Sequence, residues 1–330
     1  MKYIPTRLDV ELSNICNAAC PMCSRTNINN TKPNNTSSYI NDKTQITFDL
    51  FKNIIDKNTF IKDYNFCGNW SDPAAAKDFL KIIEYIANEK VTINIDTNGG
   101  LKSKEWWKEL GKILSCNPKN AITFSIDGLE DTNHLYRRHT NFNKIIENAV
   151  SYINNTKAEA IWAFIPFKHN EHQINIAKQK AKKLGFKRFV INHTARFYNL
   201  KTNSFIFYED GVKGILEPAE ISPEVILYDN NNIKCLAKIT KNLFLSFDQL
   251  IFPCCYIEDS FRKRNDAQLN SIIDMNDLEK LDASKYNFLD IIQSDIFKLI
   301  EMSWVKNTPS TCYKKCSLKQ SNIRKNIGLQ

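Results

Sequence analysis

Near its N-terminus the chain reads Ser13-Asn-Ile-Cys-Asn-Ala-Ala-Cys-Pro-Met-Cys-Ser-Arg25. Cys16, Cys20 and Cys23 form the pattern C-x3-C-x2-C directly after a predicted strand at residues 8–12. Three thiolates on one short loop can hold three corners of a [4Fe-4S] cube, and no fourth cysteine follows nearby. One iron of such a cube would stay open to a further ligand.

A structural zinc site is the alternative for this loop. Zinc would need a fourth Cys or His, usually from a second C-x2-C pair, and a spacing of three residues is unusual for it. Ordinary buried cysteines would not be packed three into eight residues of a loop. The pattern therefore favours iron and sulfide over zinc.

The first 200 residues alternate between short apolar runs and helical patterns. Strands are expected at residues 8–12, 64–67, 91–96, 121–126, 160–167 and 189–192, and helices at 48–57, 74–88, 103–115, 141–154 and 171–184. This alternation predicts an α/β fold of parallel βα units. Six units are too few for a closed eight-stranded barrel, so we expect a partial (β/α)6 TIM-like barrel.

The pattern changes after about residue 200. Residues 243–252 read as a β-hairpin that turns at Asp248-Gln249, and residues 288–304 read as one helix. We therefore expect two domains: a barrel over residues 1–205, and a small C-terminal domain of β-hairpin and helix over residues 206–330.

Length and composition describe an ordinary globular chain. Its 330 residues suit about two domains, and 42% hydrophobic and 25% charged residues exclude disordered or coiled-coil chains. Uncharged stretches such as Ile161 to Phe167 fall far short of the roughly 18 apolar residues that cross a bilayer. Arg7, Asp9 and Glu11 stand where a secretory signal needs its apolar segment, so we expect a cytoplasmic protein that does not bind membranes.

The net charge of +9 is concentrated in two segments, residues 172–188 and 307–330, which contain no acidic residue. The first has an apolar stripe opposite its lysines, as expected of a solvated helix face. It lacks the interleaved aromatic residues and glycines of a nucleic-acid patch. These features argue against a nucleic-acid partner.

Ten cysteines without an export signal indicate metal ligands more than a disulfide framework. Four cysteines from three separated C-terminal segments can converge on one metal centre: Cys235, Cys254, Cys312 and Cys316. Zinc suits four thiolates equally well. Cys255 is an alternative ligand, but its side chain should face away from that of Cys254 if the strand continues.

The loop of Cys16, Cys20 and Cys23 resembles that of the radical S-adenosylmethionine (SAM) enzymes. The resemblance implies a [4Fe-4S] cluster whose open iron is chelated by the amino and carboxylate groups of SAM. Reduction then cleaves SAM into methionine and a 5′-deoxyadenosyl radical. Met22 stands where that family usually has an aromatic residue, and it can still pack against adenine.

Further motifs are similar to those of this family. Residues 66–73, Phe-Cys-Gly-Asn-Trp-Ser-Asp-Pro, occupy the place of a Gly-Gly-Glu-Pro-like turn that takes the SAM amino group, and Trp70 and Ser71 depart from its glycines. The resemblance implies that Ser125 contacts the ribose or methionyl part and that Arg137 pairs with the SAM carboxylate. The implied SAM contacts are Met22, Gly68, Asn69, Ser71, Asp72, Asn98, Ser125 and Arg137.

The C-terminal cysteines and hairpin are similar to the twitch or SPASM auxiliary-cluster domain of radical SAM enzymes. The resemblance implies a second [4Fe-4S] cluster on Cys235, Cys254, Cys312 and Cys316, which accepts an electron from the substrate or only orders the domain. It also implies a reducing partner such as flavodoxin or ferredoxin.

The expected function is hydrogen abstraction from a peptide or a small metabolite such as a sugar. Modification of RNA and a non-catalytic metal-binding role are the alternatives. The cofactor supplies the chemistry, so the sequence assigns no separate catalytic side chain. Four polar residues at the last strand ends are candidate substrate contacts, although each also fits a structural role: His169, Asn170, His193 and Arg196.

Overall fold

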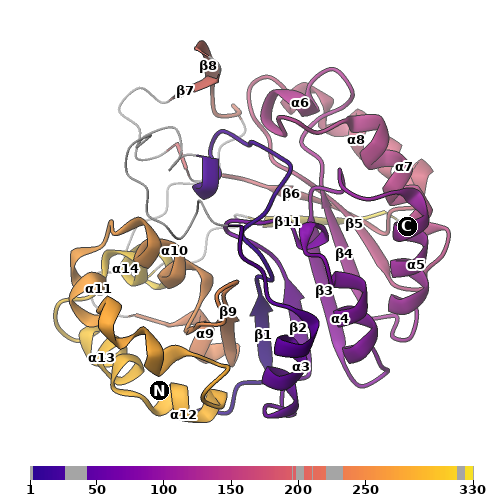
Figure 1. Cartoon of the computed structure of the whole chain (residues 1–330). Coiled ribbons are helices and arrows are strands. Elements are labelled where there is room, and N and C mark those ends of the chain that lie inside the picture. Colours follow the sequence, from indigo (N-terminus) through magenta and orange to yellow (C-terminus); the bar gives the residue numbers. More distant parts are fainter. Residues whose placement is uncertain are drawn as a thin grey trace.

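The computed structural model describes residues 3–26, 43–194, 196–197, 204–209, 211–220, 233–317 and 324–329. Its main feature is a nine-stranded sheet with the order β10-β9-β1-β2-β3-β4-β5-β6-β11 (Figure 1). The strands are β1 (Arg7–Val10), β2 (Asp63–Phe66), β3 (Thr92–Thr97), β4 (Ala121–Ser125), β5 (Glu159–Phe164), β6 (Arg188–Asn192), β9 (Asn242–Leu245), β10 (Ile251–Phe252) and β11 (Arg324–Gly328).

Strands β1 to β6 are parallel and follow one another across the sheet, which confirms the predicted α/β partial barrel. The connecting helices are α3 (Phe48–Asp56), α4 (Phe79–Ile86), α5 (Lys104–Leu114), α6 (Asn133–Tyr136), α7 (Phe142–Ile153) and α8 (Ile174–Leu184). Helix α3 begins after the N-cap Thr47, whose Oγ1 accepts a hydrogen bond from Leu50 N at 3.3 Å. Its apolar stripe is buried in the core, as amphipathic periodicity predicts.

Two predicted helices of this region begin with separate 3₁₀ turns. Residues 74–88 divide into η1 (Pro73–Ala75) and α4, and residues 171–184 divide into η2 (Glu171–Gln173) and α8. At the first break Ala76 has extended backbone, with ψ of 134°. Helix α8 ends at Gly185, whose φ of 90° suits the left-handed conformation that glycine tolerates.

The predicted C-terminal hairpin is present, and it extends the main sheet. Strand β9 pairs antiparallel with β10 and parallel with β1, so that Leu243 lies opposite Leu8. The turn contains Gln249 with φ of 63°. One hydrophobic core runs beneath these strands and under the C-terminal helices. The division into domains at residue 205 stays a prediction.

The C-terminal helices gather beyond β9 at one end of the sheet (Figure 1). They are α9 (Leu236–Ile239), α10 (Cys255–Lys263), α11 (Ala267–Ile272), η3 (Met275–Leu281), α12 (Phe288–Gln293), α13 (Asp295–Ser303) and α14 (Ser310–Cys316). The expectation of one helix over residues 288–304 is wrong, because Ser294 has extended backbone with ψ of 159°. The break lets Phe288 and Phe297, on successive helices, both reach the core.

A separate hairpin of β7 (Phe205–Glu209) and β8 (Val212–Leu216) lies near the cysteine loop. Phe207 and Leu216 pack in one apolar cluster with Cys20 and Met22. No helix in the described ranges is both long and apolar enough to cross a bilayer.

Candidate functional site

The loop of Cys16, Cys20 and Cys23 follows β1 and is fixed by backbone hydrogen bonds to its neighbours. Asp72 N, in the loop after β2, donates to Ile15 O at 3.0 Å, and Ala19 N donates to Arg138 O at 3.1 Å. Cys23 N donates to Cys20 O at 3.0 Å, which closes a turn. The three thiols are not in disulfides. The loop therefore holds three thiols at the carboxyl ends of the parallel strands.

Polar groups from neighbouring loops point at these sulfurs. Asn98 Nδ2 lies 3.7 Å from Cys16 Sγ, and Arg137 Nη1 lies 3.8 Å from Cys20 Sγ. The thiol of Cys23 donates to Asn69 O at 3.7 Å. Three of the predicted SAM contacts thus lie against the cysteine loop, although they come from three different strand ends.

Burial raises the pKa of the Cys16 thiol to about 12 and also raises the pKa of Cys20, where Arg137 opposes the rise. Iron binds thiolate, so loading this site releases protons. Free thiols with N–H donors beside them are a donor set that fits a [4Fe-4S] cluster, because cluster sulfurs accept such hydrogen bonds. Within the described residues no three His, Cys, Asp or Glu side chains stand close enough to hold a single metal ion.

The loop after β2 packs tightly around a carboxylate that the sequence analysis missed. Glu11, at the end of β1, accepts at Oε1 from Trp70 N at 2.7 Å, Ser71 N at 3.0 Å and Ser71 Oγ at 3.1 Å. A Cβ on Gly68 would stand 2.5 Å from Ser71 O and 2.8 Å from Glu11 Oε1. Only glycine at position 68 allows this packing. The hydroxyl of Ser71, a predicted SAM contact, is hydrogen-bonded to Glu11.

Glu11 Oε2 is buried and has no hydrogen-bond partner among the described residues. Burial and the neighbouring Glu258 raise the pKa of Glu11 well above its usual range. A buried carboxylate oxygen needs a hydrogen-bond donor or a cation, and an ammonium group provides both. The site thus fits SAM, whose methionyl group carries one.

Asp72 links the loop after β2 to the end of β3. This buried carboxylate accepts from Ala74 N at 3.0 Å, Thr97 Oγ1 at 2.9 Å and Asn98 N at 2.7 Å. Asn98 in turn donates from Nδ2 to Asn17 Oδ1 at 2.9 Å. Asp72 therefore positions Asn98 against the cysteine loop.

Arg137 follows α6 and forms a buried ion pair. Its Nε lies 2.6 Å from Asp127 Oδ2, and the Asp127 side chain is 0% exposed. Burial lowers the pKa of Arg137, but the neighbouring Asp127 outweighs this and the net shift is upward. Met22 is buried beside Tyr136, whereas Ser125 is the half-buried last residue of β4.

The candidate substrate contacts have different surroundings. Asn170 is structural: it is buried, accepts from Phe167 N at 2.7 Å and donates to Asp127 O at 2.8 Å. His169 stacks on Phe167 with ring centroids 5.3 Å apart, and burial lowers its pKa to about 4. Arg196 Nη1 donates to Tyr136 Oη at 3.0 Å, and His193 is half-buried just after β6.

The four C-terminal cysteines lie within electrostatic range of one another, although no three of them stand close enough to share a single metal ion. Cys235 and Cys254 are the N-cap residues of α9 and α10, and Cys312 and Cys316 lie one turn apart on α14. The Cys235 thiol hydrogen-bonds Cys316, which lowers the pKa of Cys316 to about 6. Burial raises the pKa of Cys254 and of Cys312 to about 12, and the neighbouring cysteines add to both shifts.

Cys255 has different neighbours from Cys254. Its pKa is raised well above its usual range by burial and then by Cys254, Asp9, Glu258 and Glu11. The strand does not continue through these two residues, because β10 ends at Phe252 and α10 begins at Cys255. Cys254 is the N-cap with extended backbone and Cys255 is the first residue of the helix, so the two side chains still have different surroundings.

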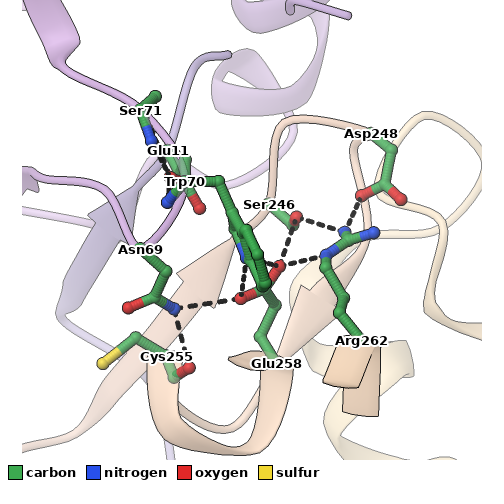
Figure 2. Close-up of polar contacts among 9 residues, drawn as sticks. All are labelled: Glu11, Asn69, Trp70, Ser71, Ser246, Asp248, Cys255, Glu258 and Arg262. Atoms are coloured by element: carbon green, nitrogen blue, oxygen red, sulfur yellow. Dashed lines mark hydrogen bonds and ion pairs between the residues drawn. The ribbon is translucent and has the colours of Figure 1, made fainter. Parts of the chain in front are cut away.

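A buried polar network joins the C-terminal helices to the loop after β2 (Figure 2). Glu258 of α10 is 0% exposed and accepts from Asn69 Nδ2 at 2.9 Å and from Trp70 Nε1 at 3.0 Å. Its countercharge is Arg262, one turn later, which also reaches Asp248 at 2.8 Å. The sequence analysis missed this network, although Glu258 stands four residues after Cys254, on the same face of a helix.

Comparisons with known proteins agree with this geometry. The family model of the Radical SAM superfamily matches residues 10–173. SuiB from Streptococcus suis bound to S-adenosylmethionine is similar over 77% of this chain and 61% of its own, with TM-score 0.51 and 15% identity. SuiB bound to the precursor peptide SuiA aligns over 88% of this chain and 65% of its own, with TM-score 0.57 and 16% identity.

Native anSMEcpe with bound AdoMet and Kp18Cys peptide is also similar, over 96% of this chain and 94% of its own, with TM-score 0.53 and 14% identity. The chain spans less than two thirds of the length of SuiB. At such identities the similarity establishes the fold. No curated protein matches the chain.

Proposed function

Because this chain belongs to the radical SAM superfamily, we propose that it acts on a peptide, abstracting hydrogen with a radical made from SAM at Cys16, Cys20 and Cys23. The observation that carries this proposal is the set of three thiols on one loop, with Asn98 and Arg137 directing N–H groups at two of the sulfurs. The alternative small-metabolite substrate keeps the same radical chemistry.

When bound, the cluster supplies the electron that cleaves SAM into methionine and the 5′-deoxyadenosyl radical. The chain's own residues position and enclose the reactants. Glu11 offers a buried carboxylate oxygen to the SAM ammonium, and Asp72 fixes Asn98 beside the cysteine loop. Arg137, held by Asp127 through Nε, directs Nη1 toward Cys20 of the cysteine loop, and a guanidinium there suits the SAM carboxylate.

A peptide substrate is supported by two of the similar structures. SuiB was solved with the precursor peptide SuiA, and anSMEcpe was solved with the Kp18Cys peptide. The test is a dithionite-driven assay of the anaerobically reconstituted protein with a peptide library and, separately, with sugars. Peptide-dependent 5′-deoxyadenosine and a modified peptide mass are expected. Turnover with sugars only would contradict the peptide assignment.

We also propose that Cys235, Cys254, Cys312 and Cys316 hold an auxiliary [4Fe-4S] cluster. Their convergence from three separate segments supports it, because a small unit gains stability from a shared metal. The other cluster, at Cys16, Cys20 and Cys23, would take its electron from a reducing partner such as flavodoxin or ferredoxin. Ten cysteines outside disulfides agree with a cytoplasmic protein.

Replacing Cys254 by alanine should remove the auxiliary cluster, whereas Cys255→Ala should keep it. We expect about eight irons per chain in the parent protein and in Cys255→Ala, and about four in Cys254→Ala. Iron, zinc and sulfide are quantified together after anaerobic reconstitution. Loss of iron from Cys255→Ala alone would reverse the ligand assignment, and zinc at this site would exclude iron and sulfide.

Glu11→Gln should weaken SAM binding by about tenfold, because a hydrogen bond to a charged group is lost. The amide keeps one oxygen for Trp70 N and Ser71 N, but it presents an N–H donor where the carboxylate has an acceptor. Equilibrium dialysis of the reconstituted protein with SAM measures this. An unchanged SAM dissociation constant would exclude Glu11 from the site.

A further inference from the structure

We propose that Glu258 is a positioning residue through which the auxiliary site at Cys235, Cys254, Cys312 and Cys316 sets the affinity for SAM. This inference rests on the proposed function. Glu258 lies on a helix that starts at one auxiliary ligand, and its carboxylate holds the loop that lines the SAM site (Figure 2).

The loop of Asn69, Trp70 and Ser71 is hydrogen-bonded to two buried carboxylates. Glu11 takes the backbone N–H groups of Trp70 and Ser71 from the side of β1. Glu258 takes side-chain N–H groups from the opposite side, with Asn69 Nδ2 at 2.9 Å and Trp70 Nε1 at 3.0 Å. Two carboxylates therefore define where this loop lies.

The same loop contacts the cysteine loop. Asn69 O lies 3.7 Å from Cys23 Sγ, and Asn69 Nδ2 also donates to Cys255 O at 2.8 Å. Asn69 thus touches both the cysteine loop and the start of α10. A shift of α10 would move the backbone beside Cys23.

The position of Glu258 depends on the first turn of α10. Cys254 is the N-cap, and Glu258 N donates to Cys254 O at 3.3 Å. Helix α10 also packs on α14, which carries Cys312 and Cys316, through a hydrogen bond between Ser260 and Thr311. A metal shared by Cys254 and α14 would fix this turn, and its loss would free it.

The carboxylate of Glu258 is held in position by a buried ion pair. Arg262 pairs with it inside the core, and Arg262 Nη2 is itself held by Ser246 Oγ at 2.6 Å and Asp248 Oδ1 at 2.8 Å. Because a buried carboxylate must keep its partners, Glu258 cannot leave Asn69 and Trp70 without a large loss of stability. The loop and the helix therefore move together.

A double-mutant cycle on the reconstituted holoenzyme tests the coupling, with the SAM dissociation constant as readout. Glu258→Gln alone and the Cys312→Ala/Cys316→Ala pair alone should each weaken SAM binding by about tenfold. The variant that combines all three substitutions should have a SAM dissociation constant within about twofold of that of either variant alone. Multiplication of the two effects would overturn the coupling.

Asp248→Asn is the matched control, because it removes a carboxylate charge beside Arg262, keeps an oxygen that can accept from Arg262 Nη2, and does not touch the loop at 69–71. It should leave the SAM dissociation constant within about twofold. Trp70→Phe, which removes the indole N–H together with part of the buried ring, should weaken SAM binding at least as much as Glu258→Gln and is measured if that variant does not fold. If parent protein binds SAM but the cycle is additive, only the coupling fails. If parent protein binds no SAM, the proposed function fails with it.

Discussion

Replacing Cys16, Cys20 and Cys23 by alanine is expected to abolish 5′-deoxyadenosine formation and to lower the iron content from about eight to about four per chain. The three residues are the only cysteines on the loop after β1, so no thiol remains there to hold a cluster. Iron and sulfide quantification and a dithionite-driven assay for 5′-deoxyadenosine measure both effects.

The control for this variant is the auxiliary pair Cys312→Ala/Cys316→Ala. It should also lose about four irons, yet it should keep a cluster on the first loop and form 5′-deoxyadenosine when SAM is in excess. Retention of 5′-deoxyadenosine in the triple variant would show that another part of the chain cleaves SAM.

Arg137→Met should destabilise the protein by about 3–5 kcal/mol, because it leaves the fully buried carboxylate of Asp127 without its cation. Burial already raises the pKa of Asp127, and Arg137 opposes that rise. Without Arg137 the folded-state pKa rises further above its unfolded value. The destabilisation should therefore grow as pH rises through the usual carboxyl range toward neutrality. Anaerobic urea unfolding without SAM measures it.

Arg188→Met is the matched control for Arg137→Met. Arg188 pairs with Glu159 at 2.6 Å, but both side chains are more than a third exposed. Its loss should cost under about 1 kcal/mol and should show little dependence on pH. Equal costs for the two variants would mean that the Asp127–Arg137 pair is not a buried anchor of the site.

Local patterns predicted most of the first 200 residues. The strands are short and apolar, the helices have clear apolar stripes, and each repeats the same βα step. The break at Ser294 was missed because apolar periodicity continues across it, and only the backbone of one residue is extended.

Pairings between distant segments could not be predicted. Nothing in residues 242–245 indicates that β9 lies beside β1, or that β11 closes the other edge on β6, because strand pairing is decided by the assembled sheet. The same limit hid the buried network. Trp70 was noted as a departure from the family's glycines, but its partner Glu258 lies 188 residues away.

The cysteines were easier to find than their surroundings. Thiol spacing is local and chemically specific, so candidate cluster ligands could be named from the sequence. Asn98 and Arg137 were named from a resemblance, and their contacts with the cysteine loop came from the fold. Glu11 could be found neither from thiol spacing nor from the resemblance, since a single carboxylate after a strand forms no motif.

The most direct test of radical SAM chemistry is the Mössbauer spectrum of ⁵⁷Fe-loaded Cys312→Ala/Cys316→Ala protein, recorded with and without SAM. The only cluster left in this variant should be the one on Cys16, Cys20 and Cys23. We predict that SAM changes the signal of one iron in four, because only one corner lacks a thiolate. A spectrum that SAM leaves unchanged, or zinc in place of iron, would contradict the account.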